Sequence, residues 1–291
     1  MRAGMAVLAA AFVVSSASAD PLEGEKSPAE ILAETEPADW RALDPENTLY
    51  IELESGRVVV ALSSVLAQGA VAAFKQHVRD GFYDGLSFYR VIDGFVAQGG
   101  DALGVRGEQK SLKAEFDEPA PDGFPFHRMK DKDGYAPEAG FIESLPAGYD
   151  PKAKRAWLLH CTGAIALGRD NGKDTASTEF YITLQPQRYL DRNLTVFGRV
   201  VAGMEHIQAL RRVEPPQSKD DDLGDRIISM KIAADIPSKE RSSLEILDSA
   251  RPVFERYAES RRNRPEDFFY YRPDHLDICQ LTVPARPAEA Q

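Results

Sequence analysis

The sequence predicts a mainly β protein, built as an antiparallel barrel or sandwich that carries two helices. Three observations support this fold class. Short segments in the middle of the chain alternate apolar and polar residues, as half-buried strands do. Only two stretches in that region place apolar residues at helical spacing. Strands and helices do not alternate regularly, so the pattern differs from that of a parallel sheet with crossover helices.

The first nineteen residues have the pattern of a cleaved secretory signal. They combine an early positive charge at Arg2, a short apolar run and the ending Ala17-Ser18-Ala19. The apolar run is too short to span a bilayer comfortably, and no cysteine follows the expected cleavage site after Ala19 to carry a lipid. We therefore expect a soluble periplasmic or secreted protein that starts near Asp20.

The next elements follow in order along the chain. Residues 20–47 are rich in Pro, Glu and Ala, and are expected to form an arm or short helix on the domain. Residues 48–63 alternate on both sides of Glu54-Ser55-Gly56, which predicts a hairpin with glycine in its turn. A helix should follow, ended by Gly81, because apolar residues recur at helical spacing at Val71, Phe74, Val78 and Phe82.

After the stretch from Gly85 to Asp101, residues 102–156 are rich in Gly, Pro, Asp and Lys. They predict a long surface loop with little core of its own. Further strands are expected at residues 164–168, 179–185, 195–201 and 226–233. Between the last two strands, a second helical stripe consists of Met204, Ile207, Leu210 and Val213.

The tail predicts a kinked helix packed on the domain, because Leu244, Leu247, Phe254 and Tyr257 have helical spacing around Pro252. Residues 277–283 are expected to form a late strand. We therefore divide the chain into a signal peptide (1–19), an arm (20–47), a main domain (48–236) that contains the insertion 102–156, and a C-terminal extension (237–291).

The composition excludes several function classes. A formal net charge of -11, with no cluster of Lys or Arg, argues against a nucleic-acid binder. The five histidines lack metal-ligand spacing, and neither a nucleophile motif nor a phosphate-binding glycine loop is present. Cys161 and Cys279 are the two cysteines. In an oxidising compartment they could form one disulfide, or they could be two small buried side chains, and the sequence leaves both options open.

Arg90 stands out in the stretch GLSFYRVIDGFVAQGGD. At a period of two it should share one face of a strand with Leu86, Phe88 and Ile92. A guanidinium cannot shed its charge and is costly to bury unpaired, so it should either reach water or serve a site. The Gly99-Gly100 pair that follows favours a site.

Four segments resemble the cyclophilin-type peptidyl-prolyl isomerases, and they occur in the family's order. FYRVIDGFVAQGGD at 88–101 is similar to the signature F-H-R-V-I-x-x-F-M-x-Q-G-G-D. The other three are GAIALG at 163–168, STEFYI at 177–182 and YLDRNLTVFGRVVAGM at 189–204. The resemblance covers residues 48–233 without the insertion, and together with the signal it indicates the exported bacterial type.

The resemblance implies a closed eight-stranded antiparallel barrel capped by two helices, with Arg90 facing a groove on its outside. It implies that Arg90 is the catalytic residue and that the enzyme needs neither cofactor nor metal. The implied partners are proline-containing unfolded or flexible polypeptides, bound by a monomer. The implied substrate-binding residues are Phe95, Val96, Gln98, Gly168, Tyr181, Tyr189, Leu190 and Leu194.

These residue types suit the chemistry of prolyl isomerisation. Rotation about an amide bond meets a barrier of about 18–20 kcal/mol because the nitrogen lone pair is delocalised. A fixed donor near the prolyl nitrogen binds the twisted transition state better than either planar isomer. Apolar side chains would hold the pyrrolidine ring, and Gln98 would hold the backbone on the other side of the bond.

Five departures from the family pattern bear on turnover or ligand binding. Tyr89, Glu179, Tyr181, Tyr189 and Leu194 stand where the family has histidine, glutamine, phenylalanine, tryptophan and histidine. None of these changes removes the arginine, so we expect retained but reduced or retuned turnover. Tyr189 in place of tryptophan disfavours tight binding of cyclosporin-like ligands.

Two other functions compete with isomerisation. The same groove could bind proline-containing segments as a catalytically weak chaperone or scaffold module, or a barrel with an apolar lumen could hold a small ligand. The insertion also allows two interpretations. It could border the substrate path and select among chains, or it could be a solvated decoration without a role.

Overall fold

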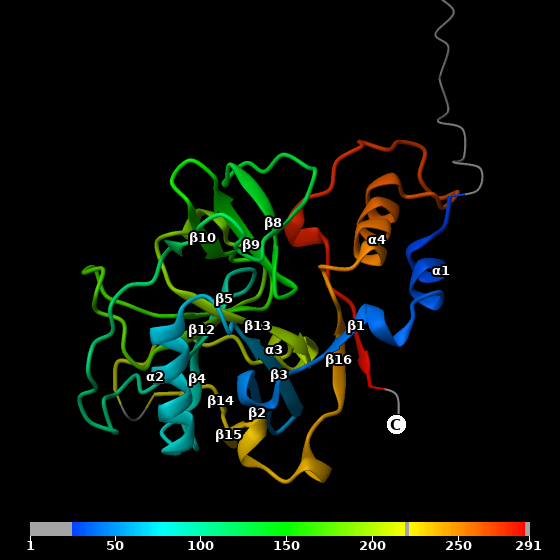
Figure 1. Cartoon of the computed structure of the whole chain (residues 1–291). Coiled ribbons are helices and arrows are strands. Elements are labelled where there is room, and N and C mark those ends of the chain that lie inside the picture. The colour runs from blue at the N-terminus through cyan, green and yellow to red at the C-terminus, as the bar shows by residue number, and fades with distance from the viewer. Residues whose placement is uncertain (1–24, 219–220, 289–291) are drawn as a thin grey trace, which may run out of the picture.

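The computed structural model describes residues 25–218 and 221–288 (Figure 1). The expected signal, residues 1–19, and its cleavage site after Ala19 lie outside the described residues. Within the described part of the chain, no helix has both the length and the apolar character that crossing a membrane requires.

A curled antiparallel sheet of nine strands forms the main domain as a half-barrel (Figure 1). This confirms the mainly β prediction, whereas the sheet has one strand more than the expected eight. The reason is that the strand expected at 226–233 is divided into two short strands that pair at opposite edges. The strand order is β14 (Asp225–Arg226), β4 (Ser87–Val91), β5 (Val96–Gly100), β12 (Phe180–Thr183), β11 (Ala164–Leu167), β13 (Val196–Ala202), β3 (Gly56–Leu62), β2 (Thr48–Leu53) and β15 (Ser229–Ile232).

The main hydrophobic core lies between this sheet and helix α2 (Gln68–Arg79). Phe74 of α2 stacks on Tyr83 with ring centroids 4.8 Å apart and meets Phe180 edge-on at 5.5 Å. Gly81, at φ +67°, lies directly after the helix as expected. The second helix, α3 (Met204–Gln208), is shorter than its apolar stripe, because Val213 forms a β-bridge to Val91 instead.

A bulge in β4 changes which face Arg90 occupies. The register pairs Ser87 with Gly100 but Arg90 with Gln98, so β4 holds one extra residue between these two pairs. Phe88 and Val91 therefore both enter the main core, whereas Tyr89 and Arg90 both reach Gln98. The expectation that Arg90 shares a face with Phe88 was wrong, because the bulge breaks the two-residue alternation.

The prediction of a long loop at 102–156 was also wrong, because this insertion contains most of a second antiparallel sheet. Its glycines carried the loop signal, yet two of them lie in strands where a neighbour comes close. A Cβ on Gly148 would lie 2.5 Å from the Trp157 ring, and one on Gly140 would lie 2.2 Å from the carbonyl oxygen of His127. The strand order is β6 (Glu118–Pro119), β10 (Arg155–Leu158), β9 (Leu145–Asp150), β8 (Glu138–Ile142) and β7 (His127–Arg128).

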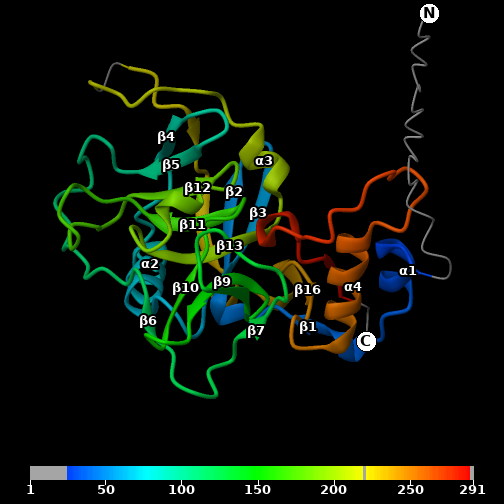
Figure 2. The same cartoon turned by 90° about the horizontal axis from the view of Figure 1, so that it is seen from above.

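The arm and the C-terminal extension pack on each other. Helix α1 (Pro28–Ala33) lies beside α4 (Pro252–Asn263) in both views (Figures 1 and 2). A three-stranded sheet has the order β1 (Trp40–Ala42), β16 (Leu244–Leu247) and β17 (Ala285–Pro287). Short 3-10 helices occupy Pro37–Asp39, Pro45–Asn47, Arg188–Leu190, Ala233–Asp235, Ser238–Glu240 and Ile278–Gln280.

The extension corrects two expectations about the tail. Residues 244–247 form a strand, and Pro252 begins a helix where its missing N–H costs nothing, so there is no kinked helix. Residues 277–283 contain a 3-10 helix, and the late strand follows them at β17. Apolar spacing alone did not separate a buried strand followed by a helix from one continuous helix.

A disulfide joins Cys161 to Cys279 across 118 positions of sequence. Both cysteines lie in a second hydrophobic core that the arm, the insertion and the extension build together. Its members include Ile31, Phe141, Trp157, Leu247, Phe254 and Leu281. The pairing that the sequence left open is thus present in the structure, and it ties the extension to the start of the segment that leads into β11.

Candidate active site

Arg90 and Gln98 lie opposite each other on the antiparallel pair β4 and β5. The Arg90 Nη1 atom donates to Gln98 Oε1 at 3.1 Å, and the guanidinium lies 5.4 Å from the centre of the Phe95 ring. Arg90 is half-buried, with a hydrogen-bond acceptor on one side and an aromatic face beside it. These contacts account for a charged side chain within an apolar stretch.

Four predicted pocket residues belong to one hydrophobic cluster. Val96 and Tyr181 are buried at 2% and 5% exposure, and the cluster also includes Phe95 and Leu194. In the register between β5 and β12, Tyr181 lies opposite Gln98. Gly168 borders the same place, because a Cβ there would lie 3.6 Å from Gln98 Nε2. The structure therefore gathers these residues beside Arg90.

Tyr189 and Leu190 lie apart from this cluster, in the 3-10 helix Arg188–Leu190. The Tyr189 side chain is largely exposed, at 59%. Their place in substrate binding stays a prediction that depends on the family resemblance.

The insertion supplies part of this hydrophobic cluster. Ala120, Ile142, Leu145, Ala147 and Ala156 share it with Val96 and Tyr181. The insertion therefore packs on the same face of the sheet as the pocket residues, opposite the main core. Its expected role in choosing among substrate chains stays a prediction.

A buried polar chain begins at Tyr181, and sequence reasoning missed it. The Tyr181 hydroxyl lies 2.8 Å from His160 Nε2, and His160 Nδ1 lies 2.9 Å from Asp191 Oδ1. An ionised carboxylate only accepts, so Nδ1 donates to Asp191, and in the neutral imidazole Nε2 then accepts from Tyr181. Burial raises the pKa of Tyr181, and Asp191 adds to the rise, so the phenol stays a donor. The sequence does not distinguish His160 from the other four histidines, which lack metal-ligand spacing.

Replacing Tyr181 by phenylalanine should lower the free energy of unfolding by about 1–3 kcal/mol, because His160 Nε2 is fully buried and loses its partner. Urea denaturation of both proteins measures the change. The matched control is Tyr189→Phe, since its ring is exposed and it should unfold like the wild type. Equal stability of the Tyr181→Phe protein and the wild type would show that the hydroxyl contact contributes nothing.

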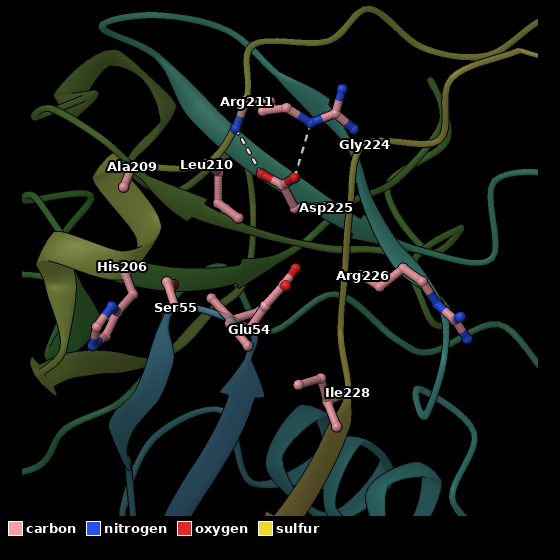
Figure 3. A pocket seen from close by; sticks show the side chains of 11 residues that line it. Glu54, Ser55, His206, Ala209, Leu210, Arg211, Gly224, Asp225, Arg226 and Ile228 are labelled. Carbon is pink, nitrogen blue, oxygen red and sulfur yellow. Dashed lines mark hydrogen bonds and ion pairs between the residues drawn. The ribbon is translucent and has the colours of Figure 1, made fainter.

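A separate cavity lies elsewhere on the molecule. It has a volume of about 920 Å³ and lies between the turn of β2 and β3, helix α3 and the segment that contains β14 (Figure 3). At one edge of the cavity Arg211 donates to Asp225, at 3.0 Å from Nε to Oδ1. No predicted site residue lines this cavity. Among the described residues, no group of three or more His, Cys, Asp or Glu side chains is placed to hold a metal ion.

Comparison with known proteins places the chain in a family. Residues 48–232 match the family model for the cyclophilin type peptidyl-prolyl cis-trans isomerase/CLD. A probable peptidyl-prolyl cis-trans isomerase of Brucella suis is 29% identical over 194 residues, 67% of this chain and 86% of that protein. Peptidyl-prolyl cis-trans isomerase B of Bacillus subtilis is 33% identical over 161 residues, 54% of this chain and 86% of that protein.

A solved structure extends the likeness beyond the matched domain. The cyclophilin AquaCyp293 from Hirschia baltica superposes with a TM-score of 0.70 and 26% identity, covering 90% of this chain and 97% of that one. The family model, the sequence relatives and this structure agree with one another. The chain therefore belongs to the cyclophilin-type peptidyl-prolyl cis-trans isomerases and is an enzyme of that family.

Proposed function

We propose that this isomerase accelerates the cis-trans isomerisation of X-Pro bonds during the folding of exported proteins, with Arg90 as its catalytic residue. The observation that carries the assignment of Arg90 is its position. Its side chain is half-buried, and its guanidinium donates a hydrogen bond to Gln98. It lies beside an apolar cluster on the outer side of the sheet. A charged donor next to an apolar pocket is what a twisted prolyl bond requires.

The mechanism divides the work between a donor and a pocket. Phe95, Val96 and Tyr181 hold the pyrrolidine ring, with Leu194 and Gly168 at the border. Gln98 accepts a hydrogen bond from one of the five N–H groups of the Arg90 guanidinium, and the remaining N–H groups can face the prolyl nitrogen. That nitrogen regains its lone pair only in the twisted state, so the donors bind the transition state better than the planar bond.

Tyr189 and Leu190 complete the groove in this proposal, at its exposed edge. The substrates are proline-containing segments of unfolded or flexible chains, because a site on the outside of the sheet accepts a chain without threading its ends. The net charge of -11 does not favour nucleic acid as a partner. We propose that the protein acts as a monomer, a state that its sedimentation velocity tests.

Exchange NMR on a short X-Pro peptide tests the function without a coupling protease. The expected result is exchange between cis and trans peptide signals that is faster with the protein than in buffer. Exchange no faster than in buffer, together with peptide binding in the groove, would replace the enzyme by the chaperone or scaffold module. Binding without any preference for proline would contradict both.

Export is part of the proposal, and it predicts that the mature protein begins near Asp20. The signal pattern of residues 1–19 supports it, and so does the Cys161–Cys279 disulfide, since such bonds persist in oxidising compartments. Intact-mass measurement on the protein recovered from the periplasm or the medium checks the cleavage site. Retention of the first nineteen residues would refute secretory processing.

We also propose that the curled sheet closes into a complete barrel through residues 225–232. Ile227 donates to the carbonyl oxygen of Leu86 at 2.7 Å, and its neighbour Ile228 donates to that of Glu52 at 2.8 Å. These two bonds link the segment to strands near opposite edges of the sheet. Hydrogen exchange of the Ile227 and Ile228 amides should then be as slow as in β3. Exchange at the rate of an exposed loop would mean an open sheet.

A further inference from the structure

Two departures from the family pattern contact each other directly behind Arg90. The Tyr89 hydroxyl donates to Glu179 Oε2, Gln98 Nε2 donates to the Tyr89 hydroxyl at 2.6 Å, and Arg90 donates to Gln98 Oε1 at 3.1 Å. The family has histidine and glutamine in place of Tyr89 and Glu179. In this protein a continuous chain of hydrogen bonds therefore runs from Glu179 through Tyr89 and Gln98 to the catalytic residue Arg90.

This chain has only one consistent direction. Arginine is a donor only, so Gln98 must turn its carbonyl oxygen toward Arg90 and its NH₂ group toward Tyr89. The Tyr89 hydroxyl must then accept a hydrogen bond from Gln98 and donate its own to another group. The Glu179 carboxylate accepts that hydrogen bond, because an ionised carboxylate only accepts.

Glu179 is held so that both of its oxygens are occupied. Oε1 accepts from the backbone N–H of Asp101 at 2.7 Å, while Oε2 accepts from Tyr89. Gly100 leaves the space for this arrangement, since a Cβ there would lie 2.4 Å from Oε1. A proton on either oxygen must weaken one of the two hydrogen bonds.

We propose that Glu179 is a positioning residue, whose carboxylate acts through Tyr89 to keep the Gln98 carbonyl oxygen toward Arg90 and so orients the guanidinium in the groove. The proposal rests on the proposed function of Arg90. Charge-assisted bonds are strong and directional, so Glu179 at one end of the series and Arg90 at the other hold the Gln98 amide in the same orientation.

The arrangement makes turnover depend on pH. Burial raises the pKa of the Glu179 carboxyl, with the nearby Asp101 charge adding to the rise and the hydrogen bonds from Tyr89 and Asp101 offsetting part of it. The other titratable groups that face Glu179 are Tyr83 and Tyr89, whose pKa values burial raises, so both remain neutral as the pH falls. Lowering the pH through the raised pKa of Glu179 protonates the carboxylate and should lower kcat.

The first test is a double-mutant cycle with Glu179→Gln and Tyr89→Phe, followed by exchange NMR. A glutamine that keeps its oxygen on the Asp101 N–H turns its NH₂ group toward Tyr89, which opposes the direction of the chain. We expect kcat to fall about tenfold with KM nearly unchanged, because misplaced donors act on the transition state. The double variant should be no slower than Tyr89→Phe alone, since both changes interrupt one chain.

The matched control is Asp93→Asn, an exposed acid in the turn of the same β4–β5 hairpin whose side chain is 82% accessible. It should have the wild-type kcat and the wild-type pH profile. The Glu179→Gln protein should lose the acidic fall in kcat. Urea denaturation of each variant separates a loss of positioning from a loss of folded protein.

A second readout does not depend on catalysis. The side-chain NH₂ signals of Gln98 in ¹H–¹⁵N spectra should shift with pH in the wild type and stay constant in Glu179→Gln. If the wild type does not accelerate exchange, the proposed function fails while these signals still decide the positioning. Gln98 signals that ignore pH in the wild type, or kinetic effects of the two substitutions that simply multiply, would overturn the proposal.

Discussion

Replacing Arg90 by alanine should lower kcat/KM for an X-Pro peptide at least about tenfold, which corresponds to about 1.4 kcal/mol of lost transition-state stabilisation. In the proposed mechanism the guanidinium is the donor that faces the twisted prolyl nitrogen. Its removal takes away an interaction that is stronger in the transition state than in the ground state. The loss should therefore fall mainly on kcat, while peptide binding in the apolar cluster survives.

The fold should tolerate this change, because Arg90 is only half-buried on the outer side of β4. Exchange NMR gives the rates, and circular dichroism with urea denaturation checks the fold. A matched control is Arg212→Ala, which removes an exposed arginine paired with Asp93 at 2.7 Å in the turn that follows β4. Wild-type turnover in a well-folded Arg90→Ala protein would remove Arg90 from the mechanism.

Reducing the Cys161–Cys279 disulfide should lower the free energy of unfolding by about 3–5 kcal/mol, the range expected for a long closed loop. The bond joins positions 118 apart, so its loss frees a large part of the unfolded chain. It also removes the covalent link between the extension and the segment before β11. Both sulfur atoms lie in the second core, so reduction should loosen the extension first.

The measurement compares urea unfolding of the oxidised and reduced wild type, which have identical side chains. Cys161→Ala and Cys279→Ala, each alone, should unfold like the reduced protein. Hydrogen exchange should show the earliest loss of protection in α4 and β16. Equal stability of the oxidised and reduced proteins would mean that hydrophobic packing alone holds the extension in place.

The sequence determined the parts of the fold that depend on near neighbours. The β2–β3 hairpin follows from alternation around Glu54-Ser55-Gly56, and α2 follows from an apolar stripe that Gly81 ends. Arg90, Phe95, Val96 and Gln98 occupy one hairpin, and the family resemblance of one continuous segment nominated them together. In the β2–β3 hairpin and in α2 the decisive contacts join residues close in the chain, where spacing alone predicts geometry.

Only the tertiary structure decided the features that depend on distant contacts. Gly140 and Gly148 contributed to the prediction of a loop. In the structure they are strand positions that His127 and Trp157 approach closely. The bulge that turns Arg90 away from Phe88 is visible only in the register against β5. These outcomes depend on which strand becomes the neighbour, and local spacing carries no information about that.

The disulfide and the hydrogen bonds around the site also depend on contacts between distant parts of the chain. The cysteine pair, the His160–Tyr181 bond and the Glu179–Tyr89 bond each join residues far apart in the chain. The family resemblance identified Tyr89, Glu179 and Tyr181 as departures from the family's motifs but did not reveal their partners. A buried polar group must find a partner wherever folding places one, so its role was set by the assembled sheet and insertion rather than by its sequence neighbours.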